Sequence, residues 1–113
     1  MSKKKQWPLK GVKVLDLGQI YNGPYAGFLL AHAGADVVKL EPLQGEVLRQ
    51  RGGGVIPLSF AMLNTNKRGI AINLKQEKGK EILIELVKEA DVLLENFAPN
   101  AMERLGLGSK VLT

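Results

Sequence analysis

The sequence predicts an α/β domain in which a parallel sheet carries helices on its faces. Short apolar segments rich in β-branched residues alternate with segments of helical periodicity, and glycine and proline separate them. The 113-residue chain is long enough for one modest core and too short for two ordinary domains. Hydrophobic residues make up 45% of the chain, as in soluble globular proteins, so disorder is not expected.

The first strand is predicted at residues 12–17, a β-branched run between Gly11 and Gly18. A polar turn follows. Pro24 then stands where a helix would begin, because proline suits the first helical position. Gly34 supplies a typical stop signal for that helix.

The second strand is predicted at residues 35–41, whose nearly continuous apolar run is typical of a strand covered on both faces. Pro42 ends it. Residues 43–57 are rich in glycine, glutamine and arginine, and because this connection is long we expect it to be functional or mobile. A short helix at residues 58–63 precedes a third strand at residues 70–74.

The clearest helix is predicted at residues 75–90, where apolar residues recur at helical spacing and charged residues occupy the other faces. The fourth strand follows at residues 91–95. A further helix begins near Pro99, and Ser109 would cap one more. Strands that alternate with helices in this way pair in parallel.

Charge and composition narrow the function classes. The net charge is +5, partly from Lys3, Lys4 and Lys5 in residues 1–8, which we interpret as a basic flexible tail ahead of a domain at 9–113. The other basic residues are dispersed and aromatic residues amount to 5%, so a nucleic-acid interface is disfavoured. No apolar run approaches the roughly 20 residues of a membrane span, and we find no targeting segment.

Metal and thiolate chemistry are not expected. The chain has no cysteine, and its single histidine, His32, lies near the end of an apolar helix, where it interacts favourably with the helix dipole. The absence of cysteine fits a cytoplasmic protein. The aspartates Asp16, Asp36 and Asp91 stand at strand ends, where carboxylates usually cap turns, and they form no catalytic triad.

Polar residues follow the predicted strands at the edge where α/β sheets bind ligands. The glycines after the first strand are too widely spaced for G-x-G-x-x-G, which disfavours an NAD site although Glu41 ends the second strand. Lys75 lies just past the third strand and suits a phosphate better than Asn66-Lys67-Arg68, which we interpret as a solvated turn. Asn96 and Phe97 follow the fourth strand either as ligand contacts or as a turn cap and a core residue.

Together these segments resemble the N-terminal part of family III CoA-transferases, the group that includes formyl-CoA transferase, carnitine CoA-transferase and α-methylacyl-CoA racemase. The resemblance extends over residues 9–112, and the order and spacing of its segments make it specific. The matching segments are residues 9–17, 23–24, 34–41, 66–68, 74–75, Gly79, 90–92, 95–97 and 104–108.

The resemblance implies an incomplete Rossmann-like domain, with helices on both faces of the sheet, that binds coenzyme A or acyl-CoA. Lys75 and Arg104 would suit the CoA phosphates. Pro42 stands where some members carry a basic residue, a departure that affects adenine-side contacts. The residues implied as CoA contacts are Tyr21, Asn22, Ile72, Asn73, Leu74, Lys75, Asn96, Phe97, Ala98 and Arg104.

The family transfers CoA between an acyl-CoA and a carboxylic acid through a catalytic aspartate, a form of covalent catalysis. The resemblance places that aspartate beyond this chain, so we assign no catalytic residue and expect the chain alone to be inactive. Full-length members form interlocked homodimers. An acyl-CoA racemase or epimerase of the same fold, and a non-catalytic CoA- or nucleotide-binding fragment, stay open as alternatives.

Overall fold

The structure is a computed structural model that describes residues 5–113, so the first four residues of the predicted basic tail lie outside the described residues. Its strands form one 4-stranded sheet in the order β3-β2-β1-β4, and every neighbouring pair is parallel. The predicted α/β class with a parallel sheet is confirmed. This order matches the first four strands of a Rossmann nucleotide-binding sheet.

The strands and helices follow one another along the chain in the predicted alternation. In chain order the elements are β1 (Lys13–Asp16), α1 (Asn22–His32), β2 (Asp36–Glu41), η1 (Val47–Gly52), α2 (Leu58–Leu63), β3 (Arg68–Ala71), α3 (Glu77–Glu89), β4 (Val92–Leu94), α4 (Ala101–Arg104) and α5 (Ser109–Leu112). Within residues 5–113, no helix is both long enough and apolar enough to cross a membrane.

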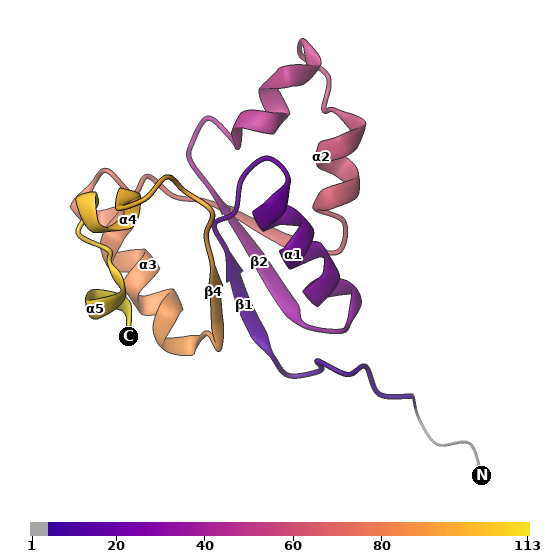
Figure 1. Cartoon of the computed structure of the whole chain (residues 1–113), viewed down its shortest axis with the longest axis horizontal. Helices are drawn as coiled ribbons and strands as arrows, with labels where there is room; N and C mark the ends of the chain where they lie inside the picture. The colour runs from indigo at the N-terminus through magenta and orange to yellow at the C-terminus, as the bar shows by residue number, and fades with distance from the viewer. Residues whose placement is uncertain (1–4) are drawn as a thin grey trace.

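Helices cover both faces of the sheet. Figure 1 shows α1 and α2 on one side of the strands and α3, α4 and α5 on the other. Successive side chains of β1 point to opposite faces, so Val14 packs in the core under α1 while Leu15 packs in the core under α3. Leu83 of α3 is 0% exposed in that second core. Full burial of such a side chain contributes about 1.5–3 kcal/mol.

The predicted start of the first helix was wrong, and the long connection contains a helical turn that was not predicted. Helix α1 begins at Asn22, so Pro24 lies inside its first turn and not at its first position. The missing N–H of proline is harmless there, because first-turn amides have no partner within the helix. The connection at 43–57 is interrupted by η1, in which the Glu46 side chain accepts a hydrogen bond from the Leu48 amide.

The third strand was also predicted too late along the chain. Strand β3 runs over Arg68–Ala71 because these residues pair with Val38–Glu41 of β2. Residues 72–74 therefore leave the sheet at its carboxyl edge and are not part of the strand. Similarly, Ser109 is the first residue of α5, and Gly108 occupies the cap position.

Candidate functional site

A cleft of about 600 Å³ opens at the carboxyl ends of all four strands. Its walls come from residues 17–19 after β1, 42–47 after β2, 72–75 after β3, Phe97 after β4, and Leu105 next to α4. This is the edge at which open α/β sheets bind ligands, and the volume lies within the range of ligand pockets. The cleft is therefore the candidate functional site.

Half of the residues implied by the sequence resemblance line this cleft. Ile72, Asn73, Leu74, Lys75 and Phe97 are on its walls. The residues that the structure does not place on its walls are Tyr21, Asn22, Asn96, Ala98 and Arg104.

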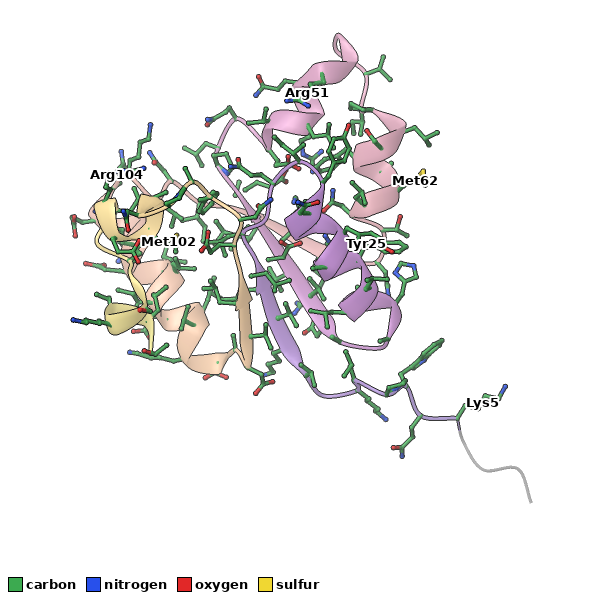
Figure 2. All side chains as sticks on the ribbon, viewed as in Figure 1. Lys5, Tyr25, Arg51, Met62, Met102 and Arg104 are labelled. Atoms are coloured by element: carbon green, nitrogen blue, oxygen red, sulfur yellow. The ribbon has the colours of Figure 1, made fainter. Side chains whose placement is uncertain are left out.

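Arg104 and Tyr21 illustrate these outlying positions. Arg104 is exposed on α4 and donates a hydrogen bond of 3.3 Å to the Pro99 carbonyl. In Figure 2 it lies on the opposite side of the molecule from Met62 of α2. Tyr21 precedes α1 and is 52% exposed. Neither side chain is therefore part of the cleft wall.

Sequence reasoning missed the wall formed by residues 43–47 together with Gln19, Gln50 and Leu105. One signal was present, because the 43–57 connection was already unusual in its length and glycine content. Gln19 lies in the polar turn after the first predicted strand, which was considered as a ligand position without naming this residue, and Leu105 carries no comparable signal. They reach the cleft through the turn after β1 and through α4, which only the tertiary fold brings together.

The 72–75 wall is shaped by close packing against α3. A Cβ added to Gly79 would lie 1.9 Å from the Asn73 carbonyl oxygen, so only glycine lets the helix approach this wall so closely. The Asn73 side chain in turn accepts a hydrogen bond from the Lys75 amide at 3.0 Å. Lys75 is exposed, and within residues 5–113 its ammonium group forms no ion pair.

The opposite wall is supported by charges that are buried. Lys67 and Asp16 form an ion pair of 2.7 Å whose side chains are 1% and 0% exposed. The Lys67 ammonium group also donates to the Pro24 carbonyl at 2.8 Å and to Asn64 Oδ1 at 2.9 Å, which uses all of its donors. Burial lowers the pKa of Lys67, and the adjacent Asp16 carboxylate opposes that shift. The prediction that Lys67 lies in a solvated turn was wrong.

A second buried pair lies beside the first. The Lys39 ammonium group is 3.6 Å from Glu46 Oε2, and both side chains are 3% exposed. Lys39 donates to the Gly18 carbonyl at 3.0 Å. Glu46 Oε1 accepts from the Ile20 amide at 2.6 Å and from the Leu48 amide at 3.2 Å. Asp16, Lys67, Lys39 and Glu46 together are called the buried ion cluster below.

Glu41 anchors η1 and does not offer a free carboxylate. Its two oxygens accept from the Arg49 guanidinium at 2.6 and 3.0 Å, and Arg49 lies over the Phe60 ring at 4.1 Å. Burial would raise the pKa of Glu41. The hydrogen bonds from Arg49 and from the Glu46 amide outweigh burial and leave that pKa lowered.

Comparisons with known proteins agree on one family. The family described as CoA-transferase family III matches residues 9–113. Formyl-CoA:oxalate CoA-transferase from Streptomyces coelicolor is 50% identical over 101 residues, which cover 87% of this chain and 25% of that protein. The chain thus spans about a quarter of the length of this curated relative.

Solved structures agree with the family match. A hypothetical protein from Mycobacterium tuberculosis superposes with a TM-score of 0.90 and 38% identity, over 96% of this chain and 31% of that one. A CAIB/BAIF family protein from Brucella suis gives a TM-score of 0.88 and 36% identity, over 96% of this chain and 30% of that one.

Proposed function

The chain belongs to CoA-transferase family III, and from this premise we propose that its cleft binds coenzyme A as part of an enzyme that moves CoA between carboxylic acids. The observation that carries the proposal is the cleft at the carboxyl edge of the sheet. Two of its walls, residues 72–75 and Phe97, are segments for which the family resemblance implies CoA contacts.

The chemistry of the cleft suits the two ends of coenzyme A. CoA joins an apolar, thiol-bearing arm to a phosphorylated nucleotide. Leu17, Leu40 and Leu74 give the cleft apolar walls, which suit the arm. Lys75 supplies an exposed cation, which suits a phosphate because charge-assisted hydrogen bonds are the stronger ones.

The aspartates support a binding role for this part of the enzyme. Asp16 is buried in its pair with Lys67, and Asp36 pairs with Arg68. Asp91 accepts a hydrogen bond from the Lys13 amide at the start of β1. None of them lines the cleft. We therefore propose that none of these aspartates acts as the nucleophile and that these 113 residues alone do not transfer CoA.

The remaining features of the whole enzyme are proposed on the family resemblance alone. Its substrates are an acyl-CoA and a carboxylic acid. Its assembly is an interlocked homodimer, and its location is the cytoplasm.

Isothermal titration of the folded chain with coenzyme A tests the binding proposal, with pantetheine as the matched ligand that lacks the phosphates. We expect saturable binding of CoA and at least about tenfold weaker binding of pantetheine, because loss of one charged hydrogen bond costs about 1.5–3 kcal/mol. No saturable binding at millimolar CoA would refute the proposal. Measurable CoA transfer by this chain alone would refute the proposed inactivity.

A further inference from the structure

The turn between β1 and α1 contains a residue in an unfavourable backbone conformation. Ile20 has φ of 65°, in the left-handed region that β-branched residues rarely adopt. The other non-glycine residues with positive φ in residues 5–113 are Asn66 and Asn100, and asparagine tolerates this region. For isoleucine this conformation is unfavourable, and it persists only where its surroundings enforce it.

Side chains from distant parts of the chain enforce this conformation. Asn96 Oδ1 accepts from the Gln19 amide at 2.7 Å, and Asn96 Nδ2 donates to the Gln19 carbonyl at 3.0 Å. Glu46 Oε1 accepts from the Ile20 amide at 2.6 Å. Asn96 follows β4 and Glu46 precedes η1, so the turn is held between two separate elements.

Glycines make room for these contacts. A Cβ on Gly23 would lie 2.6 Å from Gly18 Cα and 2.8 Å from Asn96 Oδ1. The Asn96 carboxamide therefore occupies space that only a glycine at position 23 leaves empty. Because both hydrogen-bonding groups of this carboxamide engage Gln19, they are already occupied before any ligand arrives.

We propose that Asn96 and Glu46 are positioning residues, which hold the Gln19–Ile20 turn in its strained conformation and so present Gln19 on the cleft wall. The identity of the ligand rests on the proposed function. Because the turn is already ordered before the ligand binds, no binding free energy is lost in ordering it, and affinity is higher. Lys39 pairs with Glu46 and offsets part of the cost of burying the Glu46 carboxylate.

Two substitutions separate positioning from a general loss of stability. Asn96→Ala removes both bonds to Gln19. Ile20→Gly removes the backbone strain, because glycine adopts positive φ without steric cost. The variants are Asn96→Ala, Ile20→Gly and their combination, with Glu46→Gln as the conservative change that keeps an acceptor for the Ile20 amide. The readouts are hydrogen exchange of the Gln19 and Ile20 amides without ligand and coenzyme A affinity by titration.

We expect Asn96→Ala to accelerate exchange at Gln19 and Ile20 and to weaken CoA binding about tenfold, the effect of one or two hydrogen bonds. Adding Ile20→Gly should bring the affinity back to within about threefold of the unsubstituted chain. Glu46→Gln should leave the Ile20 amide largely protected from local exchange, and it should lower unfolding stability because it removes the charge that pairs with Lys39. A purely structural role would lower unfolding stability without this recovery.

Unchanged exchange at Gln19 and Ile20 in Asn96→Ala would overturn the inference. So would faster exchange with unchanged CoA affinity, or failure of Ile20→Gly to recover the affinity. If the unsubstituted chain binds no CoA, the proposed function fails. The exchange rates, measured without ligand, then still decide whether Asn96 and Glu46 hold the turn.

Discussion

Charge serves opposite purposes on the two sides of the cleft. On the β1 side, the side chains of the buried ion cluster are at most 3% exposed, and they bond to one another and to the backbone of the first turn. On the β3 side, Lys75 is exposed and, among residues 5–113, forms no ion pair. Charge within the fold thus fixes the shape of the site, whereas the exposed charge of Lys75 is available to a ligand.

This difference makes stability and affinity separable. Substitutions in the buried ion cluster should act mainly on the free energy of unfolding, because a buried charge without its partner is costly. Substitution of Lys75 should act on ligand affinity and leave stability nearly unchanged, as for most exposed positions.

The largest effect is expected from Asp16→Asn. This change keeps an oxygen acceptor for the Gly18 amide and leaves the Lys67 charge buried without its partner. We expect a loss of roughly 3–5 kcal/mol in the free energy of unfolding, measured by urea titration. Addition of Lys67→Met should recover a substantial part of the loss, because it removes the unpaired charge.

The matched control is Asp36→Asn. Asp36 pairs with Arg68 at 2.7 Å, the distance found for Asp16 and Lys67, but these side chains are 47% and 71% exposed. Asp36→Asn should lower the free energy of unfolding by about 0–1 kcal/mol. Equal losses in the two variants would contradict the role assigned to burial.

The next effect is expected from Gly79→Ala on the β3 side. Alanine favours a helix by about 1 kcal/mol over glycine, yet its Cβ would collide with the Asn73 carbonyl. We expect Gly79→Ala to lower the free energy of unfolding by about 1–3 kcal/mol, as measured by urea titration. Gly69→Ala is the control, because its added Cβ meets nothing within 4 Å, and it should be neutral or slightly stabilising. A stabilised Gly79→Ala chain would show that this wall is free to move.

Lys75→Met tests the exposed charge by calorimetric titration. We expect about tenfold weaker CoA binding, with unfolding stability within about 0.5 kcal/mol of the unsubstituted chain. Lys13→Met removes an equal charge from the start of β1, at the other end of the sheet, and should change affinity less than about twofold. Similar weakening by both variants would indicate a long-range effect of net charge.

The smallest effect concerns pH. Because the pKa of Glu41 is lowered on folding, its contribution is present above the ordinary value of 4.5 and is lost as pH falls through the folded value. The free energy of unfolding should therefore decrease as pH falls below 4.5, and it should decrease less steeply in the Glu41→Gln variant. Urea titrations between about pH 3 and pH 6 measure the two slopes. Equal pH dependence of the unfolding free energy in the two chains would contradict the assignment of this effect to Glu41.

Elements with strong local signals were predictable from the sequence. The bounds of α2 were predicted as 58–63 and are observed there, and α3 was predicted to within a few residues. Strand β3 was misplaced because its limits depend on pairing with β2, which is not a local property. The sequence also predicted that ligand contacts follow the strands, and residues 72–75 do line the cleft.

The buried ion cluster could not be predicted in the same way. Asn66-Lys67-Arg68 has the composition of a surface turn, and only the fold places Asp16 behind Lys67. Nothing near Ile20 in the sequence marks its positive φ, since isoleucine is a residue that disfavours it. Its cause lies in Asn96 and Glu46, which are 77 and 26 residues from the groups that they bind.

Amide chemical shifts of the ¹⁵N-labelled chain, followed during titration with coenzyme A, test most directly whether the cleft binds CoA. We expect saturable shifts concentrated at the cleft walls, namely Gln19, residues 43–47, residues 72–75 and Phe97. Shifts confined to the outer surfaces of α1 and α2, or no shifts at millimolar CoA, would contradict it.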